Sequence, residues 1–149
     1  MKNHLAMMLI GASALTFVSG CSGEPKELSE TCVSWADLAT PQDQFDESDL
    51  VLIGTPISTS GTVTAFGAEA QTHLVEVSEV LKGRRVGPLI RVSSMPETCT
   101  GSGNYPNGDP LETEERIIIF ANLLDGEWLT ATPFKGTLPY APDEPLPFD

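Results

Sequence analysis

The chain has 149 residues and a formal net charge of −13, because 21 aspartate and glutamate residues stand against only 8 lysine and arginine residues. A length of this order fits one small domain after a leader segment. The strong negative charge argues against nucleic acid and anionic lipid as partners, since proteins that bind phosphate groups cluster lysine and arginine on their contact face.

The N-terminal residues have the pattern of an export signal. Lys2 is followed by an apolar stretch over residues 5–18, and Ser19 and Gly20 supply the small side chains that signal peptidases need before the cleavage point. Cys21 comes next, and the whole run resembles the cleavage and lipidation box of bacterial lipoproteins. The alternative is an ordinary signal peptide in which Cys21 is incidental.

A lipoprotein leader predicts where the protein resides. Residues 1–20 would be removed as a signal peptide, and a lipid such as palmitate on Cys21 would anchor the protein outside the cytoplasm, on the cell membrane or the outer membrane. Residues 21–31 consist mainly of Ser, Gly, Glu, Pro and Lys, with Leu28 as the single large apolar residue, a composition typical of a flexible tether.

The remaining cysteines predict a disulfide. With Cys21 carrying the lipid, Cys32 and Cys99 are left, and an even pair in an oxidising compartment most simply forms a bond. The competing interpretation is a reactive thiol, which needs a partner base. The only histidine after the leader, His73, lies inside an apparent strand, so the disulfide is favoured.

The predicted domain opens with a helix and a strand. The acidic residues 43–49 favour one or two helical turns around Phe45, and the apolar residues 50–55 favour a first strand. In residues 72–81 apolar and polar side chains alternate, as in a half-buried strand. Residues 86–93 follow as its hairpin partner.

The next segment predicts a buried strand and a second hairpin. Residues 116–121 are almost continuously apolar, as in a strand covered on both faces. Asp125 and Gly126 form a hairpin turn signal, and residues 127–131 return as a fifth strand with Trp128 in the core. The predicted fold is mainly β, a five-stranded antiparallel OB-type barrel with one short helix; a sandwich is the alternative.

Residues 135–149 are predicted to form an extended Pro-rich C-terminal tail. Their four prolines exclude a regular helix or a central strand. Three aromatic residues, Phe134, Tyr140 and Phe148, are expected to hold this tail against the domain.

Several short phrases, in their order along the chain, resemble the netrin-like domain, which includes the tissue inhibitors of metalloproteinases. The phrases are Cys32, Phe45, residues 49–55, residues 77–83, Thr98 with Cys99, and residues 116–121. The resemblance covers residues 32–134. It implies an OB-type barrel whose N-terminal segment is joined by a disulfide to the loop after the third strand, which would be Cys32 to Cys99.

The chain departs from the inhibitors of that family at its first cysteine. Those inhibitors begin with Cys-x-Cys and present the free α-amine of the first cysteine to a catalytic zinc, whereas here Cys32 is preceded by the tether and Ser34 replaces the second cysteine. The resemblance therefore implies the fold without zinc chelation.

Two places are candidates for partner contact. One is the basic cluster of Lys82, Arg84, Arg85 and Arg91, of which Arg84 and Arg85 would meet an anionic partner; the alternative is a solvated hairpin tip. The other is the loop of residues 96–115, in which Tyr105 is a candidate contact residue and several side-chain oxygens are available to calcium. The spacing of those oxygens does not match an EF-hand, so no metal site is predicted.

The sequence predicts no enzyme and no cofactor, because it has no glycine-rich phosphate loop and no His/Cys metal cluster. The preferred hypothesis is a lipid-anchored binding module for a protein or an envelope component. The alternatives are a regulator of an exported hydrolase or protease that does not chelate zinc, and a passive envelope spacer.

Overall fold

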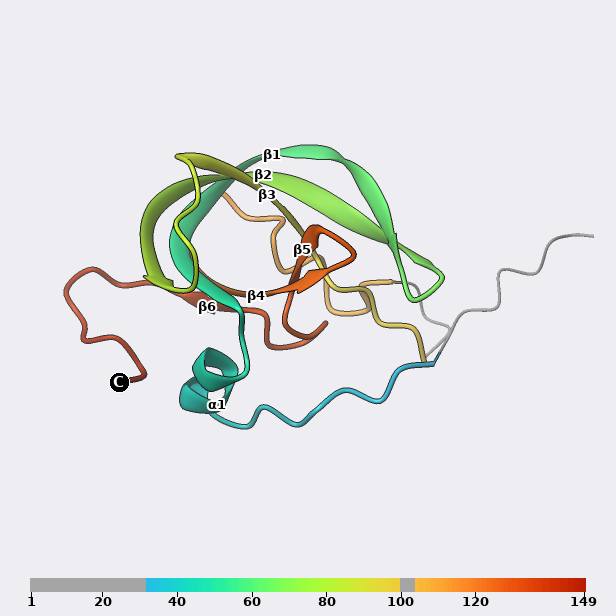
Figure 1. The fold of residues 1–149 in the computed structure, drawn as a ribbon, viewed down its shortest axis with the longest axis horizontal. Coiled ribbons are helices and arrows are strands. Elements are labelled where there is room, and N and C mark those ends of the chain that lie inside the picture. The colour runs from blue at the N-terminus through green and yellow to red at the C-terminus, as the bar shows by residue number, and fades with distance from the viewer. Residues whose placement is uncertain (1–31, 100–103) are drawn as a thin grey trace, which may run out of the picture.

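The computed structural model describes residues 32–99 and 104–149, which form a mainly β fold with one short helix (Figure 1). The elements are α1 (Pro41–Asp46), β1 (Leu50–Ala65), β2 (Ala68–Lys82), β3 (Leu89–Ser93), β4 (Ile117–Leu124), β5 (Glu127–Thr130) and β6 (Thr137–Pro139). The predicted leader, Cys21 and the tether lie outside the described residues. Within those residues no helix is long and apolar enough to cross a membrane.

Helix α1 is stabilised by side chains at both ends. The Thr40 hydroxyl accepts a hydrogen bond from the backbone N–H of Asp43 (3.1 Å), and the Asp43 carboxylate accepts one from the backbone N–H of Thr40 (2.9 Å). This reciprocal pair is a capping box. At the other end the Lys82 ammonium donates to the carbonyls of Phe45 (2.7 Å) and Asp46 (2.8 Å). A cation there complements the helix dipole and fixes α1 to the end of β2.

Five strands pair into a closed ring. β1 pairs with both β2 and β4, β2 pairs with β3, and β5 lies between β3 and β4. All of these pairings are antiparallel except that of β3 with β5, which is parallel and rests on one residue pair, Ser93 with Leu129. β6 adds to β4 as a short edge strand. All the described strands thus belong to one sheet.

The β1–β2 hairpin is long and strongly bent (Figure 1). Its register shifts at four places, and such irregularities let a strand pair curve. At its turn, Phe66 and Gly67 have φ values of 51° and 83°, the left-handed pair of a type I′ turn. Gly54 allows β1 and β2 to approach, because a Cβ there would come within 2.7 Å of the Val75 side chain.

Two apolar clusters form on opposite faces of the central strands. The first draws on all five strands of the ring and consists of Leu50, Leu52, Val75, Val92, Leu111, Ile117, Ile119, Ala121 and Trp128. The second packs beneath α1 and the tail and consists of Leu38, Val51, Ile53, Ile118, Phe120 and Ala131. The prediction of a strand covered on both faces is confirmed for residues 117–121, whereas Arg116 is exposed and precedes β4. The buried position of Trp128 is also confirmed.

The prediction of five antiparallel strands needs two corrections. The pairing of β3 with β5 is parallel, and β6 is a sixth strand within the segment predicted as an extended tail. β6 is compatible with proline because it is short and lies at an edge, where Pro139 need not donate to the sheet. The turn at Asp125 and Gly126 is confirmed by φ values of 51° and 88°.

Candidate functional site

A disulfide joins the N-terminal segment to the segment after β3. Cys32 and Cys99 are 67 residues apart in sequence, and their Cα atoms are 4.8 Å apart, within the range that a disulfide spans. A hydrogen bond from the backbone N–H of Val33 to the Thr98 hydroxyl (3.2 Å) lies beside the bond. The predicted pair is therefore placed as a disulfide requires.

A cavity of about 400 Å³ opens beside this disulfide. Its walls come from three separate segments: residues 33–38, the pair Glu97 and Cys99, and residues 132–135. Cavities that bind small ligands or single side chains have volumes of this order. The disulfide connects two of the three wall segments, so it holds these two segments together.

Aromatic rings stand at this cavity. The Trp35 ring packs edge-to-face on Phe66, from the β1–β2 turn, with centroids 5.7 Å apart, and its buried Nε1 has no hydrogen-bond partner among the described residues. Phe134 lies on another wall segment, residues 132–135, and is 54% exposed. The Phe134 side chain is therefore open to solvent at the edge of the cavity and is accessible to a ligand there.

Glu97 is a buried carboxylate in the cavity wall. The residue is only 7% exposed, and one of its carboxylate oxygens accepts a hydrogen bond from the backbone N–H of Cys99 (2.8 Å). On the rim, the Lys135 ammonium is 3.4 Å from Asp37 and donates to the carbonyl of Leu38 (3.2 Å). The cavity therefore combines apolar walls with a carboxylate that has little contact with water.

A second polar group lies under the loop of residues 96–115. The Asp109 carboxylate accepts hydrogen bonds from His73 Nε2 (2.8 Å), from the backbone N–H of Leu111 (2.9 Å) and from the Ser94 hydroxyl. Burial favours the protonated form, but these hydrogen bonds, together with the nearby imidazole, hold the pKa of Asp109 below its ordinary value. Asp109 therefore stays ionised and ties the loop to β2.

The connectivity of this group differs from that of a catalytic triad. In a triad the histidine lies between the hydroxyl and the carboxylate and removes the hydroxyl proton. Here Asp109 lies between Ser94 and His73, and the sequence analysis foresaw no such association of the three residues. The three residues therefore hold the loop of residues 96–115 to the sheet.

Tyr105 faces the protein with its hydroxyl. The hydroxyl donates to the carbonyl of Ser94 (2.8 Å) and accepts from the backbone N–H of Gln71 (2.8 Å), and the residue is half-buried. Burial raises the pKa of Tyr105 to about 12. A role for Tyr105 as a partner contact stays a prediction, and only the remainder of its ring is available for it.

The predicted basic cluster is partly occupied by contacts within the protein. Lys82 caps helix α1, and the Arg84 guanidinium lies 5.3 Å from the centre of the Trp128 ring, in cation–π contact. Arg84 and Arg85 are both exposed. Contact of these two arginines with an anionic partner stays a prediction.

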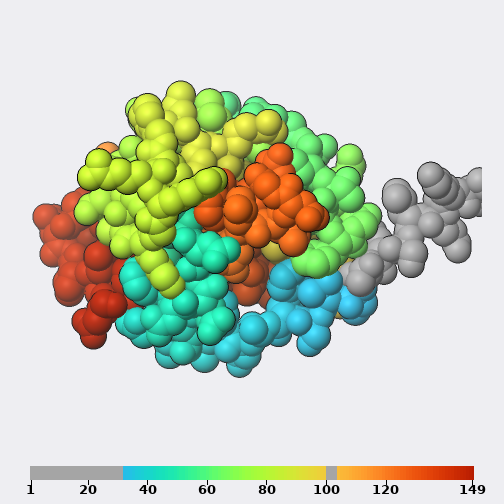
Figure 2. All heavy atoms as spheres, viewed as in Figure 1, coloured from blue at the N-terminus to red at the C-terminus, as the bar shows by residue number. Residues whose placement is uncertain are grey.

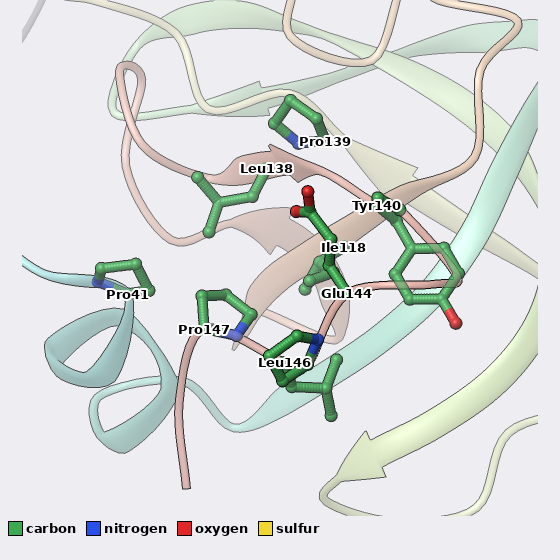
Figure 3. A pocket seen from close by; sticks show the side chains of 10 residues that line it. Pro41, Ile118, Leu138, Pro139, Tyr140, Glu144, Leu146 and Pro147 are labelled. Carbon is green, nitrogen blue, oxygen red and sulfur yellow. The ribbon is translucent and has the colours of Figure 1, made fainter.

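A smaller cavity, of about 250 Å³, lies under the C-terminal tail (Figure 3). Tyr140, Glu144 and Leu146 contribute to its walls, with Ile118 of β4 at its base, and the Glu144 side chain points toward Pro139. The lining residues between 141 and 147 are exposed and lie beyond the last strand, so this cavity is less firmly built than the one beside the disulfide.

Among residues 32–99 and 104–149 no group of three or more His, Cys, Asp or Glu residues is arranged to hold a metal ion. The oxygens that the sequence analysis considered for calcium include Asp109, which is committed to His73 and Ser94. Residues 100–103 of that loop lie outside the described residues.

No protein-family model matches the chain, and a search of curated proteins finds no similar sequence. The candidate site accordingly depends on the geometry alone. Sequence analysis identified Cys32 and Cys99 but missed Trp35 and Glu97. Glu97 carried one local signal, its position two residues before a predicted disulfide cysteine.

Proposed function

We propose that this chain is a lipid-anchored binding module that works outside the cytoplasm and has no catalytic activity. The observation that carries the proposal is the cavity of about 400 Å³ whose walls are joined by the disulfide of Cys32 and Cys99. A disulfide is expected in an exported protein, and it follows closely on the predicted lipid attachment site at Cys21.

The fold supports an OB-type barrel of the netrin-like kind. An OB-type barrel is a five-stranded Greek-key arrangement, and the ring order β1-β2-β3-β5-β4, returning to β1, is consistent with it. The netrin-like resemblance also implies a disulfide between the N-terminal segment and the loop after the third strand, which is where Cys32 and Cys99 lie.

The tether explains how such a module would reach a partner. Ten residues, 22–31, lie between the proposed anchor at Cys21 and Cys32. Because extended chain spans about 3.3–3.6 Å per residue, the domain would stand at most about 35 Å from the membrane. The net charge of −13 keeps the module away from anionic headgroups.

The absence of catalysis is supported by the way in which the polar groups are used. Asp109 separates Ser94 from His73, and the Tyr105 hydroxyl is engaged with two backbone groups. These side chains hold the loop of residues 96–115 to the sheet and are not arranged to activate a nucleophile.

The test is crosslinking in the native cell, followed by mass spectrometry of the membrane-anchored protein and of whatever is attached to it. The proposal predicts an acylated Cys21 and a reproducible partner that is lost in Phe134→Ser. Leu89→Ser is the matched control, because Leu89 is also strongly exposed (51%) but belongs to β3, away from the cavity.

An unmodified Cys21 would contradict the anchor, and a partner retained equally by both variants would contradict the assigned site. Capture of an exported hydrolase whose activity changes on binding would assign the regulatory alternative.

A further inference from the structure

We infer that the cavity beside the disulfide binds an alkyl chain that ends in a cation, the chemistry of a lysine or arginine side chain of a partner protein. The inference rests on the proposed binding function and names the group that would be bound. Its first support is Glu97, a residue that is only 7% exposed and lies in the wall of the cavity of about 400 Å³.

Glu97 lacks a cationic partner within the part of the chain that the structure describes. The ion pairs there are His73 with Asp109 and Lys135 with Asp37. Lys135 also lines the cavity, but its ammonium lies 3.4 Å from Asp37 and donates to the carbonyl of Leu38 (3.2 Å), and among the described residues it forms no ion pair with Glu97. Buried carboxylates are normally paired, because removing a charge from water is costly unless a countercharge replaces the water.

The remaining walls favour an alkyl-borne cation over a bare metal ion. Calcium takes six to eight oxygen ligands, and among the described residues no group of three or more His, Cys, Asp or Glu side chains is arranged to hold a metal ion. Trp35 and Phe134 instead line the cavity with aromatic rings, a kind of group that attracts ammonium and guanidinium ions. Val33 and Ala36 supply apolar surface for methylene groups. The net charge of −13 also draws cationic partners toward the molecule.

The experiment is a titration of the full-length protein, kept in nonionic detergent, followed through the indole N–H signals of its two tryptophans by NMR. Trp35 reports on the cavity, and Trp128, buried in the ring, serves as an internal reference. The probes are n-butylammonium, n-butylguanidinium, n-butanol and butyrate, which share an alkyl chain and differ in charge.

The expected result is a saturable shift of the Trp35 signal with n-butylammonium or n-butylguanidinium. The affinity for n-butanol should be lower by at least about tenfold, and butyrate should cause no shift. The cation that binds more tightly assigns lysine or arginine as the natural group. Glu97→Gln keeps the acceptor for the Cys99 N–H and is expected to weaken cation binding about tenfold, whereas Glu112→Gln, a matched change outside the cavity, leaves it unchanged.

Equal binding of n-butanol and the cations, or no response of Trp35 to either cation, would overturn the inference. Neither result requires a folded variant. If the cations fail to bind while crosslinking in cells still depends on Phe134, the binding module stands and only the cationic ligand is wrong.

Discussion

The two ends of the described chain are attached to the same ring by different chemistry. At the N-terminal end, Cys32 is covalently bonded to Cys99. At the C-terminal end the attachment is noncovalent: Phe148 stacks on Phe45 with centroids 4.5 Å apart and meets Phe120 edge-on at 5.8 Å. Figure 2 shows the two ends, blue and red, on opposite sides of the molecule.

This difference bears on what each end does. A disulfide holds its two segments together even when the surrounding packing loosens, so a buried carboxylate such as Glu97 can be kept in place beside it. An aromatic stack at a chain end opens by local unfolding, at a cost far below that of global unfolding. The disulfide-bonded N-terminal end is therefore suited to selective binding, whereas the C-terminal end is suited to opening by local unfolding.

The largest effect is expected from removing the covalent attachment. The double variant Cys32→Ser and Cys99→Ser should lower the free energy of unfolding by about 4 kcal/mol in the chain-entropy model, given a closed loop of this length. Urea denaturation of wild-type and variant protein measures the difference. A loss below about 1 kcal/mol would mean that the noncovalent contacts of the N-terminal segment suffice.

The second effect tests how the loop of residues 96–115 is held at its other end. Asp109→Asn should cost about 2 kcal/mol near neutral pH, because it weakens a buried carboxylate's hydrogen bonds to His73 and Ser94. The pKa of Asp109 is lowered on folding, so its contribution is present above its unfolded pKa and is lost as the pH falls through the folded pKa.

Urea denaturation of wild-type and Asp109→Asn protein, repeated from pH 7 to pH 2, checks this prediction. The difference between the two proteins should shrink as the solution becomes acidic. A difference that stays constant over this range would show that the Asp109 charge does not contribute.

The third effect concerns the C-terminal attachment. Phe148→Ala should lower the free energy of unfolding by only about 1 kcal/mol, since the ring is half-buried at a chain end. It should speed hydrogen exchange in residues 140–149 while leaving the exchange of β1 and β4 unchanged. Faster exchange in β4 as well would mean that the tail and the ring open together.

The smallest effect is expected at the rim of the N-terminal end. Asp37 is 88% exposed, and its carboxylate is 3.4 Å from the Lys135 ammonium. Exposed ion pairs contribute little, so Asp37→Asn should change the free energy of unfolding by less than about 0.5 kcal/mol. Thermal unfolding of both proteins at low and high salt measures this change. A larger loss of stability that depends on salt would mean that the ion pair helps to hold the cavity wall in place.

Local patterns predicted most of the secondary structure. The apolar run of residues 116–121 and the turn at Asp125 and Gly126 were sufficient to place β4 and β5, because both signals act within a few residues. β1 was predicted too short, since its polar second half, residues 56–65, has the composition of a loop. Only its pairing with β2 makes it a strand.

The candidate site was less predictable, because its parts meet only in the folded chain. The cysteine pair followed from counting, but Trp35, Glu97 and Phe134 come from three segments that the ring brings together. The contact of Asp109 with His73 likewise joins residues 36 positions apart, and neither residue has a local pattern that identifies the other.

The single residue pair between β3 and β5 has a consequence for where the ring opens by local unfolding. Elsewhere in the described ring the strands are joined by several residue pairs, whereas β3 and β5 share one pair, Ser93 with Leu129. A hydrogen bond from the backbone N–H of Met95 to the Thr130 hydroxyl (2.8 Å) and apolar packing of Met95 with Leu129 lie beside it. The pairing of β3 with β5 is therefore the place where the ring should open first by local unfolding. Met95 is only two residues before Glu97. A group bound to Glu97 in the cavity would therefore also stabilise the pairing of β3 with β5.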